Sequence, residues 1–141
     1  AFVLSETEAA VEVINMGKNS LPVFTHFEKR FCRVAGRPDV LYGYNEGPTR
    51  GLVGPGYFVA HFFEDRGEVG IDYHQVPPAD AILPTGWPAI KRNEQGLQIL
   101  VYAHMIDYMR VISSSVTIGR AVKKGKETPN TFLLHRTAPS A

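Results

Sequence analysis

The stretch from Asn93 to Ile112 constrains the fold more than any other part of the chain. Its apolar residues recur at helical spacing and form one broad stripe: Leu97, Leu100, Val101, Met105, Tyr108, Val111 and Ile112. A second set falls on the opposite side: Ile99, Tyr102, Ala103, Ile106 and Met109. A helix that is apolar on two faces is buried on two faces. The sequence therefore predicts a long helix over about 94–112, with a sheet against one face and a further layer or a second copy of the chain against the other.

Two shorter helices are predicted near the N-terminus. Ser5 with Glu8 three residues later matches a capping box, and Gly17 suits a helix end, which predicts a helix over about 6–16. After Ser20 the apolar residues fall within one arc of a helical wheel, and Gly36 would end this second helix. The residues of that arc are Val23, Phe24, Phe27, Phe31 and Val34.

Strand signals follow in the second half of the chain. Residues 57–63 are apolar at nearly every position, residues 68–76 alternate, and Glu64–Gly67 between them is typical of a turn. With a turn of two or four residues, the odd positions of the first strand share a face with the even positions of the second, whereas a turn of three or five residues would place His61 on the face opposite Asp72 and His74. Two further strands are predicted over 115–122 and 131–136, joined by a loop from Lys123 to Asn130. The Gly- and Pro-rich stretch over 36–56 predicts loop with at most one short strand, Val40–Tyr44.

These elements predict one α+β domain spanning residues 1–141. An antiparallel sheet of about four or five strands would pack against two N-terminal helices and one long buried helix, in the order α-α-β-β-α-β-β. The chain has 141 residues, of which 44 % are hydrophobic and 21 % charged, as in an ordinary soluble globular domain. Its formal net charge of +1 provides no strong field for nucleic acid or an acidic membrane, so neither is an expected partner. No signal segment or membrane span is apparent, and the expected location is the cytoplasm.

The predicted long helix suggests a ligand site. His104 falls in the middle of its main apolar stripe, one turn before Tyr108, so it would present an imidazole to apolar surroundings. Apolar walls with a few polar groups are typical of ligand pockets. Trp87 and Arg50 lie on irregular segments that would form the mouth of such a pocket. A core histidine bonded to a backbone carbonyl is the structural alternative.

The predicted hairpin carries a second constellation. His61, Asp72 and His74 would share one face, where two imidazoles and a carboxylate suit proton transfer or a divalent metal such as Fe²⁺ or Zn²⁺. A polar sheet face without function is the simpler interpretation, and we predict no metal at these residues. No cofactor is indicated by any motif.

The sequence therefore predicts a domain that binds a small apolar or aromatic molecule between the sheet and the long helix. One alternative is a small enzyme, a lyase, isomerase or hydrolase, that uses the histidines for acid–base or metal chemistry. The other is a structural module that assembles through its apolar helix faces and binds no ligand. The second apolar face of the long helix also predicts a homodimer.

Overall fold

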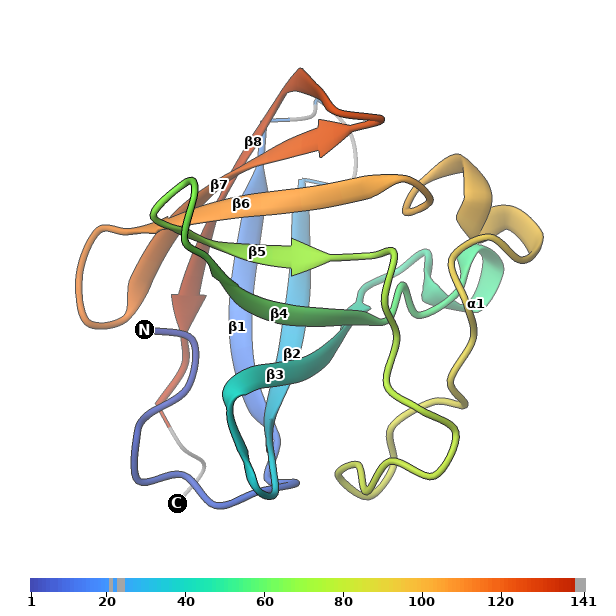
Figure 1. The fold of residues 1–141 in the computed structure, drawn as a ribbon. Helices are drawn as coiled ribbons and strands as arrows, with labels where there is room; N and C mark the ends of the chain where they lie inside the picture. Colours follow the sequence, from blue (N-terminus) through green and yellow to red (C-terminus); the bar gives the residue numbers. More distant parts are fainter. Residues whose placement is uncertain (21, 23–24, 139–141) are drawn as a thin grey trace.

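The computed structural model describes residues 1–20, 22 and 25–138, and its strands close into an eight-stranded antiparallel barrel (Figure 1). Each strand pairs with the next along the chain, and the last pairs with the first. Closure removes the unpaired edges that an open sheet would expose. The strands are β1 (Val13–Asn19), β2 (His26–Val34), β3 (Arg37–Glu46), β4 (Phe58–Phe63), β5 (Glu68–Asp72), β6 (Met105–Val111), β7 (Val116–Lys123) and β8 (Lys126–Arg136).

The predicted α+β architecture is wrong. In the described part of the chain, helical structure is confined to α1 (Arg50–Val53) and the 3₁₀ turn η1 (Gly96–Leu100). The region of the predicted first helix is irregular and then enters β1, and most of the second predicted helix is β2. Val23 and Phe24, assigned to that second helix, lie outside the described residues. The predicted long helix is replaced by η1 followed by β6, so the helical face that motivated a homodimer is absent.

The two predicted hairpins are present. In the first, β4 and β5 pair with Phe63 opposite Glu68, which leaves the four-residue turn Glu64–Gly67 and gives the expected register. Gly67 has a φ of 64°, a conformation that glycine adopts without strain. In the second, β7 and β8 pair up to Lys123 and Lys126, so the predicted long loop between them is a tight turn instead.

One end of the barrel is filled by apolar side chains. Phe31 and Phe58 are buried in contact, with ring centroids 5.3 Å apart, and the N-terminal residue Phe2 packs on Phe31 at the same separation. Glycine at position 43 permits this packing, because a Cβ there would lie 2.4 Å from the Phe58 ring and 2.5 Å from the carbonyl oxygen of Arg30. The N-terminal segment therefore closes this end as a plug.

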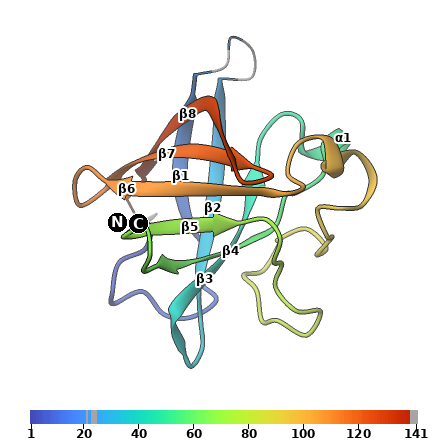
Figure 2. The same ribbon diagram turned by 45° about the horizontal axis from the view of Figure 1, so that its top comes forward.

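The opposite end carries the irregular segments. Figure 1 and Figure 2 both show α1 and η1 beside each other at the side of the barrel, and the two elements are in contact. Gln98 of η1 is bonded to the segment that follows α1, since its Oε1 accepts a hydrogen bond from the backbone N–H of Gly56 at 2.9 Å. The segment between β5 and η1 is held to the barrel by Asn93, whose Nδ2 donates to the carbonyls of Tyr57 and Tyr73. No helix in the described ranges has the length and apolar character needed to cross a membrane.

Candidate ligand-binding site

A cavity of about 460 Å³ occupies the end of the barrel that the apolar plug leaves unfilled. Its walls come from inward-facing strand residues, from α1 at the rim, and from Val101 and Tyr102, which follow η1. The apolar and aromatic members of this lining are Phe27, Pro48, Val53, Tyr73, Val101, Tyr102, Met105, Ala121 and Phe132. Lys29, Asn45 and Asp107 are the polar residues of the lining that are themselves buried. The cavity is thus a largely apolar chamber with a small polar floor.

Lys29 lies at the centre of that floor. It points inward from the middle of β2 and is only 3 % exposed. Its Nζ donates hydrogen bonds to Asn45 Oδ1 at 2.7 Å and to the hydroxyl oxygen of Tyr73, and it pairs with Asp107 Oδ2 at 3.3 Å. These three acceptors match the three hydrogens of an ammonium group. Lys29 is therefore held as a cation inside the barrel.

The partners of Lys29 are bonded to one another as well. The Tyr73 hydroxyl donates to Asp107 Oδ2 at 3.1 Å, and Asn45 Nδ2 donates to the same hydroxyl at 3.2 Å and to the carbonyl of Gly56 at 2.9 Å. These side chains come from β2, β3, β6 and the end of β5. The network therefore connects strands on different sides of the barrel. We refer to Lys29, Asn45, Tyr73 and Asp107 as the polar cluster.

Aromatic rings surround the polar cluster. The Lys29 Nζ lies 5.2–5.5 Å from the ring centroids of Phe27, Phe58, Tyr73 and Phe132. Contacts of this kind stabilise a buried cation through the negative faces of the rings. Tyr102 stacks on Tyr73 with centroids 5.2 Å apart and an interplanar angle of 18°, so the cavity has a flat aromatic wall beside its polar floor.

Burial shifts the ionisation of the cluster and its neighbours. It lowers the pKa of Lys29 from its ordinary value, and the charge of Asp107 offsets part of this shift. Burial also raises the pKa of Tyr102 to about 12, with a further contribution from the negative charge of Asp107. The pKa of Tyr73 lies well above its ordinary value for the same two reasons. Both phenols are therefore neutral hydrogen-bonding groups in the folded protein.

These shifts predict a loss of stability in alkali. In the unfolded chain the two phenols ionise near their ordinary pKa of 10.0, whereas the folded protein keeps its protons, so folding becomes less favourable as pH rises. These two phenols alone should lower the free energy of unfolding by about 2 kcal/mol between pH 10.5 and 11.5, a range in which each retained proton contributes about 1 kcal/mol. Tyr57, whose pKa burial also raises, adds to this loss. Lys29 acts in the opposite direction, because its lowered pKa makes the free energy of unfolding increase with pH. Most of that increase has occurred once the pH passes its ordinary pKa of 10.5.

Urea unfolding across this pH range measures the effect. Tyr102→Phe should reduce the loss by about 1 kcal/mol, the contribution of one retained proton. An unchanged unfolding midpoint, or tyrosinate absorbance from Tyr102 at its ordinary pKa, would contradict the buried setting of these rings.

His104 and Tyr108 are not where the sequence predicts them. His104 has a φ of 61° and an exposed side chain at the turn into β6, rather than a buried position on a helix. Tyr108 faces outward from β6, packs edge-on against Phe63, and lies under the guanidinium of Arg66 at 3.7 Å. It lines a shallow outer hollow of about 290 Å³ rather than the barrel cavity.

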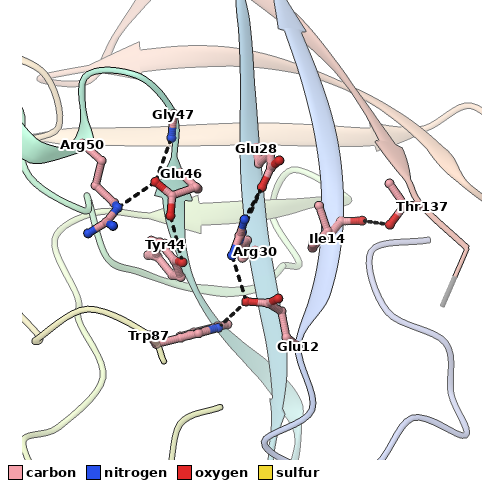
Figure 3. A network of polar contacts seen from close by, with 10 residues as sticks. All are labelled: Glu12, Ile14, Glu28, Arg30, Tyr44, Glu46, Gly47, Arg50, Trp87 and Thr137. Atoms are coloured by element: carbon pink, nitrogen blue, oxygen red, sulfur yellow. Dashed lines mark hydrogen bonds and ion pairs between the residues drawn. The ribbon is translucent and has the colours of Figure 1, made fainter. Parts of the chain in front are cut away.

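Trp87 and Arg50 belong to a polar network on the outside of the barrel, drawn in Figure 3. The Trp87 indole donates to Glu12 Oε2 at 2.7 Å and packs edge-on against Tyr44, with ring centroids 4.9 Å apart. Arg50 donates to Glu46 Oε1 at 2.6 Å. Arg50 and Glu46 also lie on the rim of the cavity, so Arg50 is the one member of the predicted ligand set that lines it.

The hairpin constellation is brought together only in part. Asp72 Oδ1 lies 2.8 Å from His74 Nδ1, and the two form a pair on the outer face of the barrel. His61 is on the same face, but it pairs across the hairpin with Gly70 and stacks on Phe63. In the part of the chain that the structure describes, no three His, Cys, Asp or Glu side chains are grouped as a metal site.

Sequence reasoning missed the polar cluster altogether. A signal for it exists: Lys29 lies between Phe27 and Phe31, and Asp107 between Met105 and Met109, each flanked two residues away by apolar side chains. In a strand, such a charge must face the same side as its apolar neighbours. Two opposite charges in this setting indicate a buried pair.

Comparison with other proteins adds no assignment to this geometry. No protein family, curated protein or solved structure gives a match to the chain.

Proposed function

We propose that the protein binds a small, mostly apolar molecule in the barrel cavity, with the polar cluster as the floor of the site. A closed barrel is compatible with such a role, since barrels of about eight strands have an interior that side chains fill or that holds one small ligand. The observation that carries the proposal is the cavity of about 460 Å³, a volume within the usual range of ligand pockets.

The distribution of side chains supports a site rather than a packing defect. At one end of the barrel the large rings pack against one another, whereas at the other end they surround a cavity that contains an ion pair and the small residue Ala121. A cation and a carboxylate are costly to bury, and an apolar core of similar volume is often as stable or more so. Their presence at the floor of an apolar chamber matches the composition of ligand sites, in which a few polar groups fix orientation.

Filling the cavity should weaken binding. With N-phenyl-1-naphthylamine, a neutral dye that fluoresces in apolar surroundings, we expect saturable binding to the unmodified protein. Ala121→Phe places a ring inside the cavity and should weaken this binding at least about tenfold, a factor that corresponds to about 1.4 kcal/mol. Fluorescence titration measures the effect.

The matched control is Ile118→Phe, which adds a ring on the outer, partly exposed face of the same strand. It should leave the dissociation constant unchanged. Thermal unfolding of both variants establishes that they are folded. Equal binding by the two variants, or no saturable binding by the unmodified protein, would refute the barrel cavity as the site.

A further inference from the structure

The hydrogen bonds within the polar cluster leave one of its side-chain atoms without a partner. The ammonium group of Lys29 has three acceptors, and the Tyr73 hydroxyl accepts from Lys29 and Asn45 while donating to Asp107. Both hydrogens of the Asn45 amide are used as well. Every donor in the cluster therefore has an acceptor within it or on the adjacent backbone.

The atom without a partner is a hydrogen-bond acceptor. Asp107 Oδ2 receives Lys29 and Tyr73, whereas its Oδ1 is buried without a hydrogen-bond partner among the described residues. Two other buried side-chain atoms share this condition, Asn93 Oδ1 and Thr117 Oγ1, but neither residue lines the cavity. Asp107 does line it and is itself only 2 % exposed. A buried carboxylate oxygen without a donor is unfavourable, so a donor from outside the chain, a water molecule or a ligand group, would stabilise it.

The charges of the polar cluster indicate which charge a ligand with a hydrogen-bond donor should carry. Lys29 and Asp107 neutralise each other, so a neutral ligand leaves the buried site uncharged. A carboxylate ligand has no hydrogen to offer and would bring a second negative charge towards Asp107. An ammonium ligand would leave a net positive charge in the interior, which is costly without a further partner.

We propose that the ligand is a neutral alcohol or phenol whose hydroxyl group donates to Asp107 Oδ1 while its apolar body lies against the Tyr73–Tyr102 wall. This inference rests on the proposed binding function and specifies the ligand class for the same cavity.

A matched set of naphthalene derivatives tests the inference on the unmodified protein. Displacement of N-phenyl-1-naphthylamine is measured at neutral pH for 2-naphthol, 2-methoxynaphthalene, 2-naphthoate and 2-naphthylmethylammonium. 2-Naphthol should bind at least about tenfold more tightly than 2-methoxynaphthalene, the factor that a hydrogen bond to a charged acceptor supplies. The two ions should bind more weakly than 2-naphthol. Tighter binding of either ion, or equal binding of 2-naphthol and its methyl ether, would overturn the inference.

A double variant links the preference to the cluster. Lys29→Met with Asp107→Leu removes both charges together and keeps the interior filled. It should bring the ratio between the affinities of 2-naphthol and 2-methoxynaphthalene close to one. A hydroxyl preference that survives in this variant would show that another group receives the ligand.

The outcomes separate the two proposals. Saturable dye binding without a hydroxyl preference retains the cavity as a binding site and refutes the ligand class. Absence of dye binding to the unmodified protein refutes the binding function itself. The comparison on the unmodified protein decides the ligand class even if the double variant does not fold.

Discussion

Asp107→Leu is expected to lower the free energy of unfolding by about 3–5 kcal/mol, the cost of leaving one member of a buried ion pair without its partner. The substitution leaves the Lys29 ammonium in a chamber of aromatic rings, where water cannot reach it freely. The Tyr73 hydroxyl loses its acceptor at the same time. Urea unfolding followed by circular dichroism measures the loss.

Two comparisons establish the cause. Adding Lys29→Met to this variant should recover most of the stability, because the pair is then replaced by apolar side chains rather than broken. Glu127→Leu removes the partner of Arg120 in an exposed ion pair and should cost less than about 1 kcal/mol. If Asp107→Leu costs no more than Glu127→Leu, Lys29 and Asp107 are not buried together.

Phe31→Ala is expected to destabilise the protein by about 3–5 kcal/mol, the usual range for removing a buried ring. Phe31 is fully buried, and its ring lies against Phe2 of the N-terminal plug and Phe58 of β4. Truncation therefore opens a void at the closed end of the barrel and loosens the plug. Thermal and urea unfolding give the change in stability.

The matched control is Phe62→Ala on β4. This ring is 56 % exposed, so its removal should change the free energy of unfolding by less than about 1 kcal/mol. Similar losses for the two variants would contradict the assignment of Phe31 to the closed end and of Phe62 to the surface.

The sequence predicted the hairpins because their signals are local. The turn Glu64–Gly67 contains glycine at a position with positive φ, and apolar residues flank it on both sides. Turn chemistry and strand periodicity then agree on the same pairing. The same holds for β7 and β8, although the turn at Lys124 and Gly125 is shorter than predicted.

The predicted helices failed because apolar spacing was ambiguous. Phe27 and Phe31 are four residues apart, and so are Met105 and Met109. A separation of four places two side chains on the same face of a strand and also near one another on a helix. In a strand the residue midway between them should be apolar too, but Lys29 and Asp107 occupy those positions. The polar residues of the candidate site therefore interrupt the alternation of apolar residues that would have identified β2 and β6 as strands.

Two further features of the barrel could not be recognised from the pattern of apolar and polar residues. Cys32 and Tyr44 face outward, yet both are buried, and Trp87 packs against Tyr44 on this side of the barrel. Strands buried on both faces lose the alternation that identifies them. Pairing of β1 with β8 joins residues more than a hundred positions apart, and no local pattern reports such a contact.

The most direct test is nuclear Overhauser contact of the Lys29 side chain, measured on the isotopically labelled protein. The account predicts contacts from the Lys29 ε-methylene to the rings of Phe58, Tyr73 and Phe132, with its ammonium protons protected from exchange with water. Only a barrel that brings these strands around one interior satisfies all of them together. A Lys29 side chain in rapid exchange with water, with contacts only to its neighbours in sequence, would contradict the account.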